Sequence, residues 1–296
     1  MADRAEITEF LRIRRARLTP SQAGLPAYGG NRRVEGLRRE EVAMLAGMSV
    51  DYYIRLERGN LSGASDSVLD SLGTALQLDE AERRHLYDMA RVTKPASGRV
   101  RSAKAPATAL RPTVQRILDS FTAPAWVRNS RLDHLGHNRA SRALYSPLLA
   151  SQAKPTNTAR FVFLDDASRE FFVDWDKAAA DVTALLRLEA GRRPHDSGLT
   201  TLVGELSTRS EAFRTLWARH DVSFHRTGSK RLRHPAVGVV ELEFEAMELP
   251  SDPDLTLLVY AVEPGTLAGD SLELLAHWAD DQERQGLLPA LQPLAR

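Results

Sequence analysis

The first third of the chain repeats hydrophobic residues with the period of an α-helix. Ile7, Phe10 and Leu11 lie three and four positions apart, and the same spacing returns further along the chain. The pattern predicts five helices: residues 3–17, two short helices within Arg39–Gly59, residues 65–76, and a last helix from Asp79 to about residue 92. Short helices in this number favour a compact all-α domain at the N-terminus.

The stretch Arg39–Gly59 (REEVAMLAGMSVDYYIRLERG) predicts two helices joined by a tight turn. Gly47 suits the left-handed backbone that often ends a helix, and Ser49 suits the N-cap of the next one. Hydrophobic residues of both helices are spaced to share a core: Val42, Leu45, Ala46, Met48, Tyr53 and Leu56, with Ala43 small enough for a close crossing.

The second of these helices leaves several side chains pointing outward near its start. They are Val50, Asp51, Tyr52 and Arg55. A helix braced in this way is typical of a helix-turn-helix, in which the second helix enters the major groove of DNA. An ordinary helical hairpin without a ligand is the alternative, but it rarely combines the turn glycine, the small residue and this core spacing in one stretch.

Two segments near the N-terminus have no helical period. Residues 18–36 are rich in Gly and Pro and predict a loop, whose Arg32 and Arg33 could reach DNA or be ordinary surface arginines. Residues 93–109 contain two prolines, small residues and four basic residues, which predict a linker. The predicted organisation is an N-terminal domain over residues 1–92, a linker over 93–109 and a second domain over 110–296.

Helical patterns fill the middle of the second domain. They predict helices over residues 112–121, 138–145, 176–189, 198–206 and 210–219, and a short strand pair over residues 125–129 and 132–137. Strands near both ends of the domain, with helices between them, predict an α+β fold around an antiparallel sheet.

The period changes from helical to alternating after Val222. Glu241, Glu243 and Glu245 alternate with hydrophobic residues, as on a strand with one wet face. The alternation slips at residues 247–249, which indicates a bulge or the end of the strand. Pro250, Asp252 and Pro253 predict the following turn. Leu255–Val262 is apolar almost throughout, which predicts a central strand.

Motifs of catalysis and metal binding do not occur: there is no G-x-S-x-G, G-x-G-x-x-G, P-loop or H-E-x-x-H. His134 and His137 lie three positions apart, and in a strand this spacing predicts opposite faces, which argues against a shared metal. The chain has no cysteine, so disulfides and thiolate metal sites are excluded. We therefore expect neither enzymatic activity nor a cofactor.

Charge is unevenly distributed, although the whole chain carries only +1. Residues 1–110 contain 18 basic and 14 acidic residues, whereas residues 111–296 contain 22 and 25. Because DNA affinity depends largely on phosphate neutralisation, the basic first part suits a nucleic-acid partner. The N-terminus lacks a hydrophobic signal region, and Leu255–Val262 is too short to span a bilayer, so we expect a cytoplasmic protein without a membrane partner.

The whole chain resembles one regulator family. The stretches that carry the resemblance are GLPAYGGNRRVEGLRREEVAMLAGMSVDYYIRLERG, RFVFLDD, ADVTALLRLEAGR, LVGEL, FRTLWARHDV, KRLRHPAVGVVELEFEAMELP and LLVYAVEPG. They are similar to XRE-family (Cro/repressor-like) helix-turn-helix regulators with an MmyB-like ligand-binding domain. The resemblance covers about residues 10–265. It implies a PAS-like fold for the second domain and a fatty-acid-like ligand. The stretch NLSGASDS after Gly59 departs from the family, whose members tend to have a proline there.

The DNA-binding candidates come from the helix-turn-helix and the segment before it. They are Arg32, Arg33, Arg38, Arg39, Ser49, Val50, Asp51, Tyr52 and Arg55. Arg39 suits a phosphate contact, and Arg55 suits a bidentate contact with guanine. Asp51 could accept from cytosine or orient Arg55, and Tyr52 could contact a thymine methyl group or a phosphate.

An apolar pocket with a few polar groups is expected in the second domain. Its candidate wall residues are Phe161, Phe163, Phe172, Trp175, Trp217 and Tyr260. The candidates for holding an acyl carboxylate are Arg219, His220 and His234. Core packing is the alternative for each aromatic residue, and a structural ion pair or a structural role is the alternative for the other three.

These observations predict a sequence-specific, DNA-binding transcription regulator that senses a small hydrophobic, fatty-acid-like ligand. We expect a homodimer on a double-stranded DNA operator, because two-fold operators mirror two-fold proteins. The alternative is a helix-turn-helix protein whose second domain senses haem or another cofactor, or is an enzyme without a recognisable motif.

Overall fold

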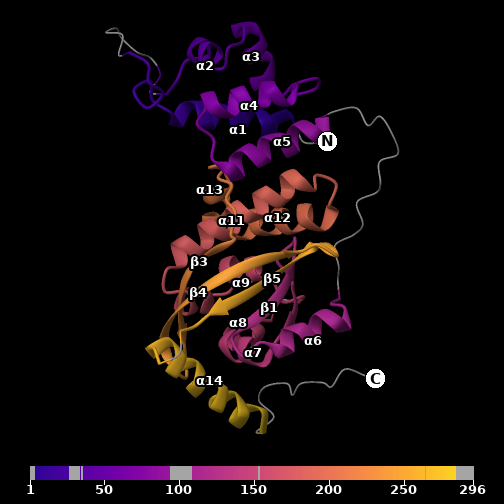
Figure 1. Cartoon of the computed structure of the whole chain (residues 1–296), viewed down its shortest axis with the longest axis vertical. Coiled ribbons are helices and arrows are strands. Elements are labelled where there is room, and N and C mark those ends of the chain that lie inside the picture. The colour runs from indigo at the N-terminus through magenta and orange to yellow at the C-terminus, as the bar shows by residue number, and fades with distance from the viewer. Residues whose placement is uncertain are drawn as a thin grey trace. The chain divides into compact units, whose positions relative to one another are not determined.

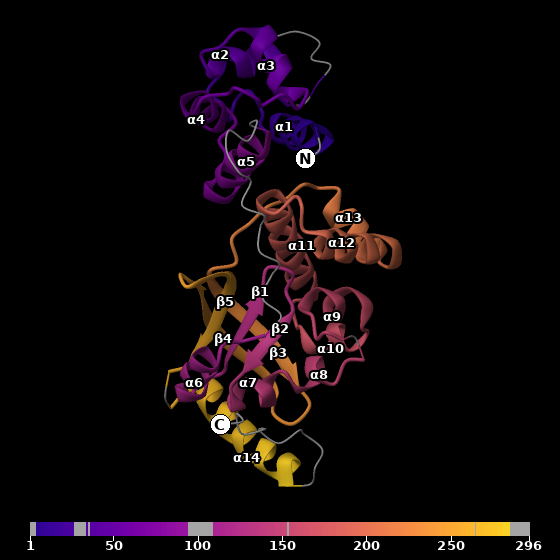
Figure 2. The same cartoon turned by 90° about the vertical axis from the view of Figure 1, so that its right-hand side faces the viewer.

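The structure is a computed structural model that describes residues 4–26, 34, 36–93, 109–152, 154–263 and 265–284. Its chain divides into two compact units, which Figures 1 and 2 show from two sides. The first unit comprises residues 1–104, 187–197 and 216–224, and the second comprises residues 105–186, 198–215 and 225–296. Arg32, Arg33 and most of the predicted linker lie outside the described residues.

Five predicted helices form the first unit's main body. They are α1 (Arg4–Arg17), α2 (Arg39–Leu45), α3 (Val50–Glu57), α4 (Asp66–Ala75) and α5 (Glu80–Thr93). Ser49 and Ser65 cap α3 and α4, each accepting a backbone N–H three residues further on. Asp79 and Glu82 each accept the other's backbone N–H at the start of α5. The N-cap predicted at Ser49 is therefore confirmed, and Ser65 and the Asp79–Glu82 pair start the next two helices in the same way.

The turn between α2 and α3 needs a backbone that most residues avoid. Gly47 has a φ of +64°, and Gly59 after α3 has a φ of +81°. A side chain on Gly59 would also begin 2.4 Å from the Arg4 carbonyl oxygen, so α1 approaches this turn closely. The core residues expected from the two motif helices are buried or packed against the core: Val42, Ala43, Leu45, Ala46, Met48, Tyr53 and Leu56.

The second unit is a sheet covered by helices. Its described strands are β1 (Ala125–Asn129), β2 (His134–His137), β3 (Thr227–His234), β4 (Gly238–Leu249) and β5 (Asp252–Ala261). The helices are α6 (Pro112–Ser120), α7 (Arg139–Leu144), α8 (Ser146–Leu149), α9 (Thr158–Leu164), α10 (Ala167–Phe171), α11 (Trp175–Arg192), α12 (Ser197–Arg209), α13 (Glu211–Trp217) and α14 (Leu267–Arg284). The last part of α11 and the end of α13 belong to the first unit.

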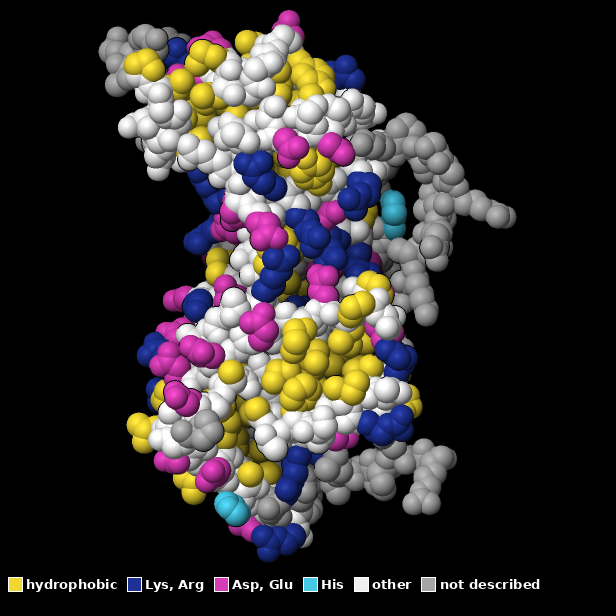
Figure 3. Space-filling model, in the orientation of Figure 1, with side chains coloured by type: hydrophobic (Ala, Val, Ile, Leu, Met, Phe, Trp, Pro, Cys, Tyr) yellow, Lys and Arg dark blue, Asp and Glu magenta, His cyan; other side chains and the backbone are white. Residues whose placement is uncertain are grey.

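The sheet is antiparallel with strand order β2-β1-β5-β4-β3, so the apolar β5 is central as predicted. On one face, α6 packs Val114 and Leu118 against Val127 of β1 and Leu257 of β5. Hydrophobic side chains stay visible on the surface over β5 (Figure 3). The expected α+β, PAS-like class is therefore confirmed.

Several boundaries differ from the sequence-based expectation. The predicted turn residues Asp252 and Pro253 already belong to β5, which begins where Asp252 pairs with Leu249 of β4. Only Pro250 and Ser251 make the turn. The predicted bulge is confirmed by a register shift at Glu248. No helix among the described ranges is long and apolar enough to cross a membrane.

Candidate functional site

Helix α3 and its N-cap present most of the predicted DNA-reading side chains to solvent. Val50, Asp51 and Arg55 are exposed, as is the capping residue Ser49. Tyr52 is half-buried and packs against the hydrophobic core. The structure therefore brings these predicted residues together on one surface, with Tyr52 at its edge.

A buried carboxylate fixes α3 to its neighbours. The side chain of Glu57 is 3% exposed and accepts hydrogen bonds from Arg15 Nε (2.6 Å) and Arg39 Nε (2.5 Å). The Tyr53 hydroxyl donates to the same carboxylate over 3.2 Å. Burial raises the pKa of Glu57, but the hydrogen bonds from Arg15 and Arg39 outweigh it and hold the pKa below its usual value. Arg39 thus orients α2 on α3, while Arg38 stays exposed beside it.

A cavity lies in the second unit, between the sheet face that carries Trp126 and Leu258 and the helix α11. It holds about 720 Å³ of empty space, counting its opening to solvent. Its hydrophobic lining is Trp126, Leu132, Tyr145, Phe172, Ala178, Val182, Leu185 and Leu258. Its polar lining is Arg128, Thr158, Asp174, Lys177, Asp181, His225, Ser229, Lys230 and Arg231. A concave site whose hydrophobic walls carry a few polar groups is the usual form of a small-molecule site.

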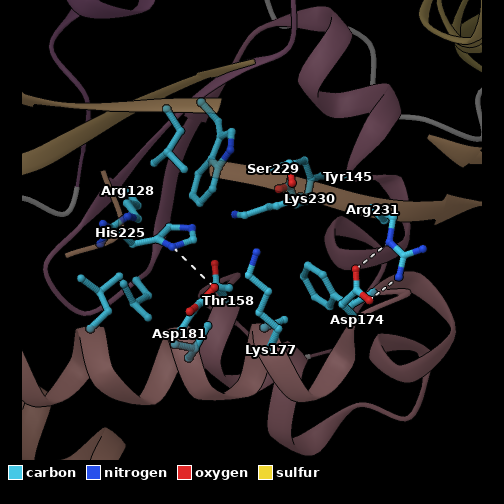
Figure 4. A pocket seen from close by; sticks show the side chains of 17 residues that line it. Arg128, Tyr145, Thr158, Asp174, Lys177, Asp181, His225, Ser229, Lys230 and Arg231 are labelled. Carbon is cyan, nitrogen blue, oxygen red and sulfur yellow. Dashed lines mark hydrogen bonds and ion pairs between the residues drawn. The ribbon is translucent and has the colours of Figure 1, made fainter. Parts of the chain in front are cut away.

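Two ammonium groups point into this cavity from opposite walls (Figure 4). Lys230 comes from β3 and Lys177 from α11, and neither has a carboxylate within 4.0 Å among the described residues. Burial, together with the nearby charge of Arg128, lowers the pKa of Lys230 to about 8, and Asp181 offsets this only in part. Neither ammonium group is therefore neutralised by a direct ion pair among the described residues.

Two acidic side chains, Asp174 and Asp181, also line the cavity. Asp174 and Arg231 form a two-bond ion pair at one end, as Figure 4 shows. Asp181 lies 3.8 Å from His225 Nδ1, and burial raises the pKa of Asp181. Burial and the charges of Lys230 and Arg128 lower the pKa of His225 well below its usual value, so this imidazole is neutral at pH 7. The lining thus carries four basic side chains, Arg128, Lys177, Lys230 and Arg231, against these two acidic ones, which favours an anionic ligand.

The indole of Trp126 adds an unused donor to the wall. Trp126 is 3% exposed, and its Nε1–H has no hydrogen-bond acceptor within the described part of the chain. Its ring stacks on His134 with centroids 4.0 Å apart and planes 8° apart. Because buried donors are almost always paired in folded proteins, an unpaired one in a cavity wall is consistent with a ligand acceptor.

The predicted wall residues are distributed over the unit, and Phe172 alone among them lines this cavity. Phe161 packs edge-on against Phe172, and Tyr260 is bonded through its hydroxyl to Tyr145, which lines the cavity. Phe163 packs edge-on against Trp175 in a separate aromatic cluster. Phe161 and Tyr260 therefore support the cavity from the core, whereas Phe163 and Trp175 belong to the separate cluster.

The predicted carboxylate-holding residues lie elsewhere. His234, the last residue of β3, is bonded to Ser146 and packs against Trp278. Trp217, Arg219 and His220 belong to the first unit. There, Trp217 lies under the Arg187 guanidinium, Arg17 donates to the Arg219 carbonyl oxygen, and His220 Nδ1 lies 3.3 Å from Glu6.

The cations of the cavity were missed by sequence reasoning. Lys230 and Leu232 share an inward face of β3, since they are two residues apart on one strand, and Leu232 is fully buried. A lysine on the same face as a buried leucine is the signal that could have found it. No comparable sequence pattern marks Lys177 and Arg128, because their position in the cavity depends on the packing of segments that are distant in the sequence.

His134 and His137 share one face, contrary to the expectation of opposite faces. The register between β1 and β2 shifts between Val127 and Arg128. As a result, His137 is the backbone partner of Trp126, and His134 is the backbone partner of Arg128. One extra residue in β2 reverses the alternation. The rings lie 4.9 Å apart and are hydrogen-bonded. No group of three or more metal-ligating side chains occurs among the residues described.

Comparison with known families agrees with both units. The model described as the MmyB-like transcription regulator ligand binding domain matches residues 110–275. A helix-turn-helix domain model matches residues 6–86. A comparison with curated proteins found no match.

Proposed function

Because the chain belongs to the family with the MmyB-like transcription regulator ligand binding domain, we propose that it is a sequence-specific DNA-binding regulator that senses a fatty-acid-like anion. The observation that carries the ligand half is the cavity of the second unit, in which Lys177 and Lys230 meet hydrophobic walls. An amphiphile with a carboxylate head satisfies both features, because its charge meets the ammonium groups and its chain meets the aliphatic and aromatic walls.

Exposed side chains at the start of α3 support the DNA half. Arg55 projects from the helix that a helix-turn-helix inserts into the major groove, and its guanidinium has no hydrogen-bond partner among the described residues. An arginine in this place reads guanine O6 and N7. Arg38 is also exposed at the start of α2, where it suits a phosphate.

Variants of these two arginines test the DNA half. After selection of a preferred operator from random DNA, Arg55→Ala should lower the preference for that operator by about 1–3 kcal/mol. Arg38→Ala should weaken binding to operator and random DNA alike, because a phosphate contact carries no sequence information. Fluorescence anisotropy at fixed salt measures both. Equal preference in Arg55→Ala and the unchanged protein would contradict the assignment.

The ligand half is tested by native mass spectrometry and calorimetry. The full chain should carry co-purifying lipid or bind added decanoate, and decan-1-ol should bind more weakly because it offers no charge to the two lysines. A protein without bound lipid from several expression hosts, and without decanoate binding, would contradict the proposal.

We further propose a cytoplasmic homodimer. Two-fold operators require two helices α3 presented by two chains, so the free protein should have twice the chain mass of 32.8 kDa, or the operator complex should have that mass plus the mass of the DNA. Mass photometry with and without operator measures this. A single chain bound to a full operator would contradict the dimer.

A further inference from the structure

Four side chains beside the cavity form a continuous line of hydrogen bonds. Ser141 Oγ lies 2.9 Å from His137 Nδ1. His137 Nε2 lies 2.9 Å from His134 Nδ1, and His134 Nε2 lies 2.8 Å from Thr158 Oγ1. Thr158 lines the cavity, whereas Ser141 is fully buried on α7 and does not line it. The line therefore runs from the interior of the unit to the cavity wall.

The surrounding structure holds this line in place. The ring of Trp126 stacks flat on His134. The backbone N–H of His134 donates to the Thr156 carbonyl oxygen, and that of Thr158 donates to the Leu132 carbonyl oxygen. These two backbone bonds fix the start of α9 beside β2, so the distance between the His134 ring and the Thr158 hydroxyl is set by the fold.

Both imidazoles in the line are neutral at pH 7. Burial lowers the pKa of His134 well below its usual value and lowers that of His137 to about 3. A neutral imidazole donates through one nitrogen and accepts through the other. Because the two rings are hydrogen-bonded to each other, the tautomer of one ring determines the tautomer of the other. Either both rings carry the proton on Nε2, or both carry it on Nδ1.

The buried end of the line decides between these two arrangements. The Ser141 hydroxyl has one side-chain partner in the described chain, His137 Nδ1. If His137 carried its proton on Nδ1, the Ser141 hydrogen would be buried without an acceptor, which is costly. Ser141 therefore donates to His137, His137 to His134, and His134 to Thr158. The Thr158 oxygen then acts as an acceptor in the line, and its own hydrogen is available to the cavity.

We propose that Ser141, through the two histidines, sets Thr158 as a hydrogen-bond donor to the cavity, so that the site selects ligands whose polar end only accepts hydrogen bonds. This inference rests on the proposed function, because it takes the cavity as the ligand site. The other free donors agree: the ammonium groups of Lys177 and Lys230 and the indole N–H of Trp126 donate only. A carboxylate, with two oxygens and no hydrogen, fits this set.

Nitrogen-15 NMR of the full chain with labelled histidine reads the direction of the line. The ring nitrogens with and without a proton have well-separated shifts, and the signals of His134 and His137 are assigned by their loss in single His→Gln variants. We expect Nε2–H on both rings, in the free protein and with decanoate. A proton on Nδ1 of either ring would overturn the proposal.

Ser141→Ala removes the buried end of the line without touching the cavity. Decanoate affinity should fall about three- to tenfold, the worth of one neutral hydrogen bond, and both rings should lose their exclusive Nε2–H form. Ser146→Ala is the matched control, since it removes a comparable serine–imidazole bond, 3.0 Å long, to His234 outside the line. It should leave decanoate affinity unchanged. Unchanged affinity and unchanged ring protonation in Ser141→Ala would contradict the proposal.

The two levels of the proposal fail separately. If the unchanged protein does not bind decanoate, the ligand half of the proposed function fails, while the histidine spectrum of the free protein still decides the direction of the line. If Ser141→Ala does not fold, Thr158→Val and Thr158→Ser replace it. The valine variant should lose affinity and the serine variant should keep it, because serine retains the hydroxyl. Equal affinity of the two variants would overturn the proposal.

Discussion

The two units treat buried charge in opposite ways. In the first, the carboxylate of Glu57 meets Arg15, Arg39 and the Tyr53 hydroxyl, so its charge and its acceptor oxygens are satisfied within the fold. In the second, Lys230 lies against the ring of Phe244 at 4.7 Å and has no carboxylate within salt-bridge distance among the described residues.

This difference separates a scaffold from a binding site. A satisfied network is costly to disturb, which keeps the recognition helix in one orientation relative to its neighbours. Donors left without acceptors are costly to keep, and a ligand that supplies the acceptors recovers that cost. The buried carboxylate of the helix-turn-helix unit is therefore satisfied without a DNA partner. The unit with the cavity is expected to gain stability when a ligand supplies acceptors to its donors.

The largest expected effect is on the Glu57 network. Glu57→Gln removes the charge that two arginines face, and breaking such a buried pair costs about 3 kcal/mol or more. Hydrogen exchange measured by mass spectrometry should therefore speed up in peptides covering α2 and α3 by about 100-fold, since 1.4 kcal/mol corresponds to a factor of ten.

Glu9→Gln is the control for this variant. Glu9 pairs with Arg12 on the exposed surface of α1, where the side chain is 43% exposed, so its loss should cost less than about 1 kcal/mol. If exchange in Glu57→Gln matched that in Glu9→Gln, the buried network would not be what holds α3, and the contrast between the units would disappear.

A smaller effect, opposite in sign, is expected at Lys230. Burial depresses the folded-state pKa of this lysine to about 8, so below that pH the folded protein carries the buried ammonium charge at a cost in stability. Lys230→Met should stabilise the ligand-free protein by about 2 kcal/mol at pH 7, and this gain should shrink as pH rises through 8, where the lysine of the unchanged protein loses its charge. Decanoate affinity should fall by about tenfold or more.

Thermal unfolding with and without decanoate measures both parts of that prediction. Lys154→Met is the control, because Lys154 is exposed and lies outside the cavity. A Lys230→Met protein that is less stable than the unchanged one and still binds decanoate equally would show that the ammonium group serves the fold and not the ligand.

Local signals explain what the sequence predicted well. The helix-turn-helix follows from spacing, a turn glycine and caps within about twenty residues, all visible in one stretch. The final helix α14 carries the same kind of signal, with Leu275 and Ala279 buried four residues apart, and was overlooked. It could have been predicted from the sequence.

The cavity could not be predicted in the same way. Three of its cations lie on different elements: Arg128 on β1, Lys177 on α11 and Lys230 on β3. They come together only through the packing of these segments. The shared face of His134 and His137 depends on one bulge, because a single extra residue exchanges the two faces of a strand. Single-sequence reasoning sees residue types and spacing but not such register shifts.

The smallest expected effect concerns His85, a buried polar residue of the first unit whose ring, unlike the Glu57 carboxylate, is not satisfied by hydrogen bonds among the described residues. His85 lies in the first unit, 1% exposed, and neither of its ring nitrogens has a hydrogen-bond partner among the described residues. Burial, with the charges of Arg187 and Arg14, lowers its pKa to about 4, and Glu6 opposes them only in part. The folded state therefore keeps this histidine neutral where the unfolded chain takes up a proton.

The sign of the pH dependence follows from that depressed pKa. The stability that His85 contributes is fully present above the unfolded-state pKa of about 6.5 and is lost as pH falls toward 4, by about 1 kcal/mol at pH 5.5. His85→Leu should remove this part of the slope when urea unfolding is followed at pH 7.5 and 5.5, whereas His277→Leu, at an exposed position on α14, should not. An unchanged slope in His85→Leu would mean that the imidazole finds a partner in solution, and the first unit would then be as fully satisfied around His85 as it is around Glu57.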